Sequence, residues 1–118
     1  MPLNSKKKIV IIGDDAASLY MIRELLVDEH LEAIPLRQGS GTLDLVKFIR
    51  PDLVLLDSAM SSSLGDAIRE VLGQDEETKK IPLVPCSSTE GNRLRERVQW
   101  HGTSKETGKE MHDVPKTR

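Results

Sequence analysis

The sequence predicts a single α/β domain built around a parallel β-sheet. Short apolar segments rich in β-branched residues alternate with longer segments whose apolar residues recur at helical spacing, which is the pattern of strand–helix–strand units. Two of the apolar segments end in acidic residues: residues 9–12 precede Asp14 and Asp15, and residues 53–56 precede Asp57. If these segments are neighbouring parallel strands, the carboxylates meet at the carboxyl edge of the sheet, where open α/β folds bind ligands. Clustered carboxylates repel one another, so such an edge calls for a metal ion or a proton.

Length and composition are those of an ordinary one-domain protein. The chain has 118 residues and a net charge of −2 with interleaved signs, so no global basic field favours nucleic-acid binding. Only Tyr20, Phe48 and Trp100 are aromatic, which leaves no stacking platform for bases. The single cysteine, Cys86, excludes an internal disulfide framework. No apolar stretch approaches the roughly 20 residues of a membrane span, and no signal peptide is recognisable, so we expect a cytoplasmic protein without a membrane partner.

The first strand and the first helix are expected at residues 8–12 and 16–27. The strand is apolar almost throughout, as a parallel strand buried on both faces should be. Apolar residues of the helix share one face, which is expected to pack on the sheet. This face carries Leu19, Ile22, Leu26, Ala16 and Tyr20.

The second strand is expected at residues 31–36. Its Pro35 has no N–H group for the ladder, which favours a position at a sheet edge. A glycine-containing turn at residues 38–41 then opens a short helix that runs to about Ile49. Pro51 ends this helix, and the third strand follows.

A third helix, a fourth strand and a fourth helix are expected before the pattern stops. The third helix is marked by Leu64, Ile68, Val71 and Leu72. The fourth strand is expected at residues 81–86. The fourth helix carries a thin apolar stripe of Leu94, Val98 and His101. Residues 103–118 are mostly polar, so we expect a domain at residues 1–102 followed by a disordered or loosely held tail.

Three short motifs stand at the ends of the expected strands. The first is Lys8 and four apolar residues followed by Gly13-Asp14-Asp15, the second is Leu56-Asp57-Ser58-Ala59-Met60-Ser61, and the third ends in Ser87. Together they resemble the receiver domains of two-component response regulators. In that comparison Gly13 replaces the first residue of an acidic triplet, and Ser61 replaces a proline.

The resemblance implies a flavodoxin-like, doubly wound parallel sheet with strand order 2-1-3-4-5. The end of the chain departs from this pattern, because the fifth strand would fall on residues 103–108, which are poor strand formers. A fifth strand and a fifth helix are therefore expected to be degenerate or missing. The family's lysine after strand five falls on Lys109, and its aromatic switch position falls on Glu106.

The resemblance also implies a set of site residues. Asp57 would be the phosphoacceptor, and Asp14, Asp57 and the backbone carbonyl of Ala59 would bind Mg²⁺. Asp15 would partly substitute for the missing first acid. Ser87 and Lys109 would contact the transferred phosphoryl group. The implied protein is a signalling phosphoacceptor rather than an enzyme, with catalysis limited to its own phosphotransfer and dephosphorylation.

The implied partners are proteins. A histidine kinase or a phosphotransfer protein would supply the phosphoryl group, and a separate effector protein would read the state through protein contact. One alternative is a pseudo-receiver that acts independently of phosphorylation as an interaction or homodimerisation module, using the edge of strand four and the surface of the fourth helix. Another is a flavin-binding protein, which the shortage of aromatic residues disfavours.

Each site residue also has a simpler interpretation. Asp57 could be a turn residue after a strand, and Asp14 and Asp15 could cap the first helix and complement its positive end. Ser87 could be an ordinary strand-end hydroxyl, and Lys109 an ordinary solvated lysine.

Overall fold

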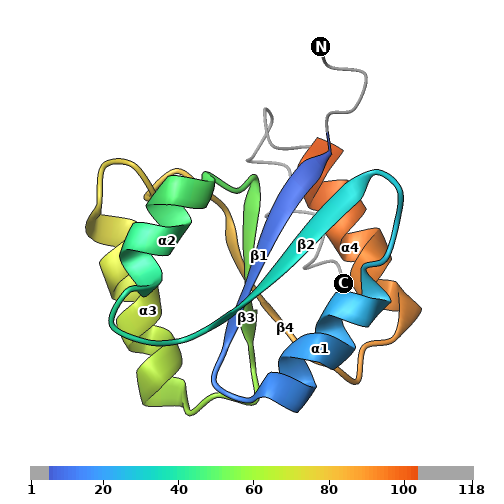
Figure 1. The fold of residues 1–118 in the computed structure, drawn as a ribbon, viewed down its shortest axis with the longest axis horizontal. Coiled ribbons are helices and arrows are strands. Elements are labelled where there is room, and N and C mark those ends of the chain that lie inside the picture. Colours follow the sequence, from blue (N-terminus) through green and yellow to red (C-terminus); the bar gives the residue numbers. More distant parts are fainter. Residues whose placement is uncertain (1–5, 104–118) are drawn as a thin grey trace, which may run out of the picture.

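The computed structural model describes residues 6–103 of the chain, and in this range strands and helices alternate as expected. The elements are β1 (Lys7–Gly13), α1 (Ala16–Leu25), β2 (Leu31–Arg37), α2 (Thr42–Ile49), β3 (Leu53–Asp57), α3 (Ser62–Gln74), β4 (Leu83–Cys86) and α4 (Asn92–Thr103). The four strands are parallel and lie in the order β2-β1-β3-β4 (Figure 1). This arrangement confirms the predicted doubly wound, flavodoxin-like sheet. Predictions for residues 104–118, including those for Glu106 and Lys109, fall outside the described part of the chain.

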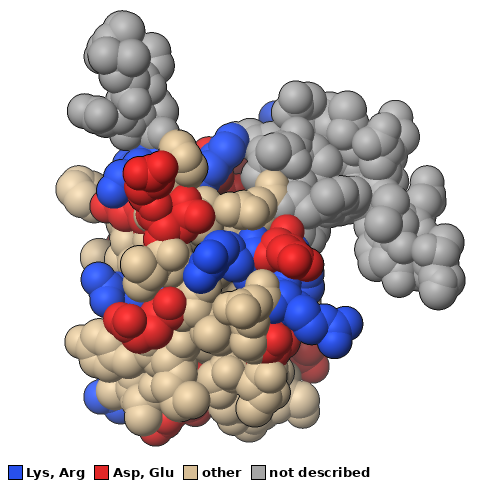
Figure 2. Space-filling model, turned by 90° about the vertical axis from the view of Figure 1, so that its right-hand side faces the viewer, with Lys and Arg blue, Asp and Glu red and all other residues tan. Residues whose placement is uncertain are grey.

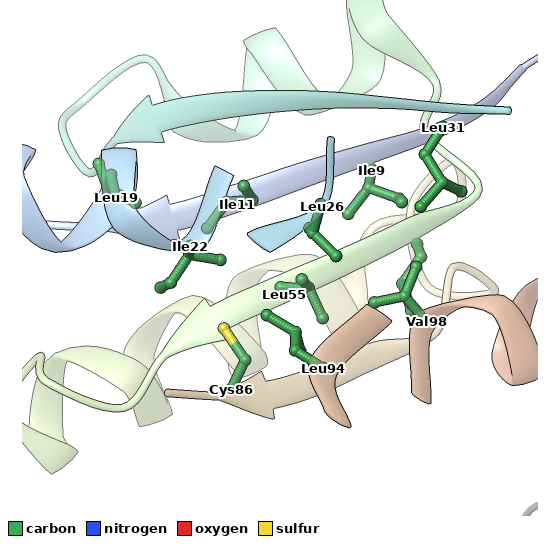
Figure 3. Close-up of a cluster of buried hydrophobic side chains, with 11 residues drawn as sticks. Ile9, Ile11, Leu19, Ile22, Leu26, Leu31, Leu55, Cys86, Leu94 and Val98 are labelled. Atoms are coloured by element: carbon green, nitrogen blue, oxygen red, sulfur yellow. The ribbon is translucent and has the colours of Figure 1, made fainter. Parts of the chain in front are cut away.

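Helices cover both faces of the sheet, which explains why the central strands are apolar on both sides. Helices α1 and α4 lie on one face, and α2 and α3 lie on the other (Figure 1). The cluster on the α1 side is drawn in Figure 3 and contains Ile9, Ile11, Leu19, Ile22, Leu26, Leu31, Leu53, Leu55, Cys86, Leu94 and Val98. The cluster on the α3 side contains Val10, Ile12, Val46, Val54, Leu56, Met60, Ile68 and Leu72.

Pro35 lies on the outer side of the edge strand β2, as predicted from the sequence. The amide of Lys7 donates to the His30 carbonyl (3.1 Å), and the Gln38 amide donates to the Gly13 carbonyl (2.7 Å). Because backbone groups alternate in direction along a strand, the even-numbered residues of this segment face β1. The nitrogen of Pro35 therefore faces away from β1, where its missing N–H removes no ladder bond.

A proline also lies on the outer side of β4. The Val54 amide donates to the Pro82 carbonyl (2.9 Å), and the Ser58 amide donates to the Cys86 carbonyl (2.8 Å). By the same alternation, the backbone of Pro85 faces away from β3. Its carbonyl accepts a hydrogen bond from Nη2 of Arg97 in α4 (2.9 Å). The outward-facing Pro85 thus has no donor to offer another strand, and its acceptor is occupied.

Helix α4 lies on the face opposite α3, and this has a topological consequence. Right-handed crossovers place α2 and α3 on one face, since both connect strands added in the same direction across the sheet. A helix that led from β4 to a further parallel strand beyond it would lie on that same face. Leu94 and Val98 instead pack with α1. Helix α4 therefore closes the α1 side of the described domain, and the adjoining part of the α3 side has no such cover.

Three sequence predictions are corrected. Tyr20, which was placed on the buried face of the first helix together with Ala16, is 60% exposed, and Ala16 is exposed too. The buried stripe is narrower and is carried by Leu19 and Ile22, while Tyr20 points to solvent one residue further round. The fourth strand begins at Leu83 rather than at residue 81, because the chain before it forms a turn.

Charged side chains of both signs are interspersed on the face formed by α1 and α4 (Figure 2). The lower part of this view, toward the carboxyl ends of the strands, is largely uncharged. Within residues 6–103, no helix has the length and hydropathy that crossing a membrane requires.

Candidate functional site at the carboxyl edge of the sheet

The strand register places Asp57 between the ends of β1 and β4. Ile12 pairs with Leu56, and Asp57 pairs with Cys86. Asp57 follows Leu53 and Leu55 in the alternation of β3, so its side chain is directed to the face that α1 covers. The predicted meeting of the strand ends is therefore observed, with Asp57 at the centre of the carboxyl edge.

The carboxylate of Asp57 is buried and only half satisfied. The residue is 2% exposed. Its Oδ1 accepts a hydrogen bond from the Ala59 amide (3.0 Å), whereas the buried Oδ2 has no hydrogen-bond partner among the described residues. A buried polar atom without a partner costs on the order of 1–3 kcal/mol. The arrangement thus favours any ligand that can supply a positive charge or a donor at Oδ2.

Gly13 permits the close approach of β1 to Asp57. A Cβ atom built on Gly13 would lie 3.0 Å from Cβ of Asp57, 3.0 Å from Cδ2 of Leu19 and 3.2 Å from Oδ2 of Asp57. These separations are tighter than ordinary van der Waals contact. Gly13 occupies the position of the first acid in the receiver pattern. A larger residue at this position would press against Oδ2 of Asp57, so the glycine also serves the packing of the strand ends.

The two acids after β1 have different roles in the structure. Asp15 is the N-cap of α1, and its Oδ2 accepts a hydrogen bond from the Ser18 amide (2.8 Å). Asp14 has an exposed side chain, and its backbone carbonyl accepts a hydrogen bond from Nη2 of Arg37 (3.4 Å). The capping interpretation is confirmed for Asp15, which leaves Asp14 as the acid free to serve a ligand.

The donors for a cation at this edge are few. In the described range, no three His, Cys, Asp or Glu side chains gather into a metal-binding group. The predicted set of Asp14, Asp57 and the Ala59 carbonyl consists of two carboxylates and one backbone oxygen. Such a set suits Mg²⁺, which commonly keeps several waters and takes one or two protein carboxylates. The unpartnered Oδ2 of Asp57 supports the fit.

Ser87 lies one residue beyond Cys86, so it is next to the site, but its hydroxyl is engaged in its own loop. Its Oγ shares a hydrogen bond with Oγ1 of Thr89 (2.8 Å) and accepts from the Thr89 amide (3.1 Å). The Ser87 amide donates to Oε2 of Glu90 (3.0 Å), and Oε1 of Glu90 accepts from Arg97. Arg97 also holds the Pro85 carbonyl. The loop after β4 is therefore locked to both β4 and α4.

Two neighbours of the site were not singled out from the sequence. Cys86 lies beside Asp57 in the register, and burial, followed by the negative charges of Asp57 and Glu90, raises the pKa of its thiol to about 12. Arg69 of α3 lines a hollow of about 240 Å³ that also reaches Asp57. No motif identifies either residue, although the helical spacing of α3 could have placed Arg69 one turn beyond Gly65.

Comparisons with known proteins agree with the fold and with the resemblance to receiver domains. No family model matches the chain. The chain is 28% identical over 96 residues to the polar-differentiation response regulators DivK of Brucella anthropi and of Brucella ovis, which covers 81% of this chain and 78% of each relative. The crystal structure of a response regulator receiver modulated diguanylate cyclase from Pelobacter carbinolicus superposes with a TM-score of 0.68 at 20% identity, covering 88% of this chain and 98% of that one. The resemblance to response-regulator receiver domains is confirmed by the sequence relatives, and the structural likeness confirms the fold.

Proposed function

We propose that this chain is a two-component receiver that accepts a phosphoryl group on Asp57. The observation that carries the proposal is the buried Asp57 carboxylate, with one oxygen fixed by the Ala59 amide and the other unpartnered at the carboxyl edge of the sheet. A structural turn residue would not need an orphaned oxygen. The relatives named response regulators support the same class of function.

The residues present suggest how the transfer would proceed. A phosphohistidine of a histidine kinase or phosphotransfer protein would approach Asp57 at the carboxyl edge of the sheet, where β1, β3 and β4 end. An Asp57 oxygen would form a bond to phosphorus in line with the breaking phosphorus–nitrogen bond, and the imidazole would leave with the bonding electron pair. The Ala59 amide fixes Oδ1 and so orients the carboxylate for attack. A Mg²⁺ ion held by Asp14, Asp57 and the Ala59 carbonyl would neutralise charge on the transferring group.

The loop after β4 would report the new state. Ser87 can donate its hydroxyl proton to a phosphoryl oxygen only if it gives up its bond to Thr89. Because the same loop is joined through Glu90 and Arg97 to α4 and β4, a turn of Ser87 would disturb a connected set of hydrogen bonds. An effector protein that contacts α4 would sense this change. Lys109 is proposed as the partner of another phosphoryl oxygen.

A phosphorylation-independent binding module is the second candidate. Gly13 favours it, because the site has one acid fewer than the family pattern, and the engaged hydroxyl of Ser87 favours it as well. Dimerisation through the edge of β4 is disfavoured by Pro85, whose backbone offers no donor and whose carbonyl is held by Arg97.

A magnesium titration followed by amide NMR separates the two candidates. We expect millimolar Mg²⁺ to shift the Ala59 amide resonance, because that amide donates to Asp57. The shift should vanish in Asp57→Asn and weaken in Asp14→Asn. The control Asp44→Asn, an exposed acid on α2, should respond like the unsubstituted protein. No response of the unsubstituted protein, or an unchanged response in Asp57→Asn, would favour the binding module.

A further inference from the structure

A groove with apolar residues at its base and charged residues at its rim lies on the α3 side of the sheet, away from the carboxyl edge. Two hollows of about 80 and 380 Å³ meet there and share Val46 and Ile81 in their linings. The floor is formed by Val46, Val54, Leu72, Ile81 and Leu83. We call this surface the α3–β4 groove.

The position of α4 leaves the β4 side of the groove open. Ile81 and Leu83 pack against the α3-side cluster but remain only half buried. On this face, a crossover helix leading beyond β4 would cover them. Helix α4 packs with α1 instead, so Ile81 and Leu83 stay partly accessible among the described residues, whereas Val46, Val54 and Leu72 are buried. Gly73 of α3 adds to the opening, because a Cβ atom built on it would meet nothing within 4 Å.

The rim of the groove is predominantly basic. Its charged residues are Arg69, Lys79, Lys47 and Arg50, with Glu77 as the one acid among the residues lining the two hollows. Lys47 is paired with Asp75 (3.3 Å), and Lys79 is paired with Glu76 (2.9 Å). Within residues 6–103, the side chains of Arg69 and Arg50 make neither an ion pair nor a hydrogen bond, although the Arg50 amide donates to the Val46 carbonyl. Two guanidinium groups are thus uncommitted beside an apolar floor.

We infer that the α3–β4 groove binds an acidic amphipathic helix of a partner protein. Apolar side chains at helical spacing would replace water over Ile81 and Leu83, and flanking carboxylates would pair with Arg69 and Arg50. Asp57 does not line the groove, although Arg69 lines both the groove and the hollow that reaches Asp57. This binding needs no phosphoryl group and stands independently of the proposed phosphotransfer.

Charge disfavours occupants taken from the chain itself. Residues 104–118 contain four Lys or Arg and three Asp or Glu, so they do not complement a basic rim. Helix α4 of a second copy would present Arg93, Arg95 and Arg97 against a single Glu96. A partner helix with a surplus of carboxylates complements the charge of the rim better than residues 104–118 or a second copy of α4.

The test uses the full-length protein and a synthetic amphipathic helical peptide with Leu on one face and Glu along the borders of that face. We expect the peptide to shift the amide resonances of Gly73, Ile81 and Leu83, while a peptide with Lys in place of Glu should bind about tenfold more weakly or not at all. Asp57→Asn should bind the acidic peptide normally. That result would separate a failure of phosphotransfer from a failure of groove binding.

Variants in α3 locate the binding site. Gly73→Glu places a carboxylate in open space at the groove, and Arg69→Glu reverses a rim charge. Each should weaken the acidic peptide about tenfold or more. Gln74→Glu adds the same charge one residue away, outside the residues lining the groove, and should bind like the unsubstituted protein. The inference would be overturned if the acidic and the basic peptide bound equally well, or if Gly73→Glu bound the acidic peptide as tightly as the unsubstituted protein does. It would also be overturned if the amide shifts were confined to other surfaces, or if they appeared with rising protein concentration in the absence of peptide.

Discussion

At the scale of single residues, Asp57 and Gly13 belong to one arrangement. A carboxylate is seldom fully buried unless it is paired, yet Oδ2 of Asp57 has no partner in the described structure. Gly13 makes that position available, because any Cβ there would press on Asp57 and Leu19. Gly13 therefore leaves the site with one acid fewer than the receiver pattern, and at the same time it lets the strand ends close around Asp57.

A matched pair of glycine substitutions tests this packing. We expect Gly13→Ala to destabilise the protein by about 1–3 kcal/mol, because the added methyl overpacks a buried strand end. Gly73→Ala adds the same methyl to an open helix position and should stabilise by about 0.5–1 kcal/mol. Urea unfolding gives both values. Equal effects of the two substitutions would contradict the close contact at Gly13.

Cys86 predicts a loss of stability at alkaline pH. Its thiol pKa is raised from 9.0 to about 12, chiefly by burial and then by the charges of Asp57 and Glu90. The folded state thus holds the thiol proton more tightly, so the stability is present below about pH 9 and declines as the pH rises toward 12. The decline should reach at most about 1.4 kcal/mol per pH unit.

A comparison of two proteins isolates the contribution of the Cys86 thiol. The unfolding free energies of the unsubstituted protein and of Cys86→Ala should be measured at about pH 8 and about pH 10. We expect the difference between them to narrow at the higher pH. If the difference in unfolding free energy is the same at both pH values, the Cys86 thiol is not buried as the structure describes.

At the scale of elements, the central strands could be predicted from the sequence and the helix faces only in part. Strands β1 and β3 are buried on both sides, so their apolar runs have no competing interpretation. The apolar faces of helices are less well determined. Tyr20 and Val71 fit the spacing of buried positions, yet they are 60% and 47% exposed because narrower stripes already fill the contact.

The N-cap of α1 predicts a difference between two adjacent acids. Asp15→Ala should cost about 1 kcal/mol, because the Ser18 amide loses its acceptor and the positive end of α1 loses a nearby negative charge. Asp14→Ala should change stability by less than about 0.5 kcal/mol, since its side chain is exposed. Thermal unfolding of the two variants measures this. A larger cost for Asp14→Ala would contradict the assignment of the cap.

At the scale of the whole molecule, the resemblance to receiver domains implied the strand order, but the side of the sheet that α4 covers was not predicted. The motifs placed the strand ends together, and the acids at Asp14 and Asp57 then defined the candidate site. Helix α4 has only a thin apolar stripe, Leu94 and Val98, which would fit either face of the sheet. Local periodicity says which face of a helix is buried, but not which layer it joins. The α3–β4 groove therefore could not be predicted from the sequence, because its position depends on which helices cover each face of the sheet.

Leu94 tests the packing of α4 directly. It is fully buried in the α1-side cluster, so Leu94→Ala should cost about 2–5 kcal/mol of unfolding free energy. Leu45→Ala on α2, where the residue is 44% exposed, is the control and should cost less than about 1 kcal/mol. Similar small costs for both variants in urea unfolding would mean that α4 does not close the α1 side.

The central claim is that Asp57 accepts a phosphoryl group, and intact mass spectrometry tests it most directly. The protein and Asp57→Asn should be incubated with Mg²⁺ and a small phosphodonor, and in parallel with a phosphorylated histidine kinase. We predict one added phosphoryl group on the unsubstituted protein and none on Asp57→Asn. An unchanged mass with both donors, or the same gain in Asp57→Asn, would contradict the claim.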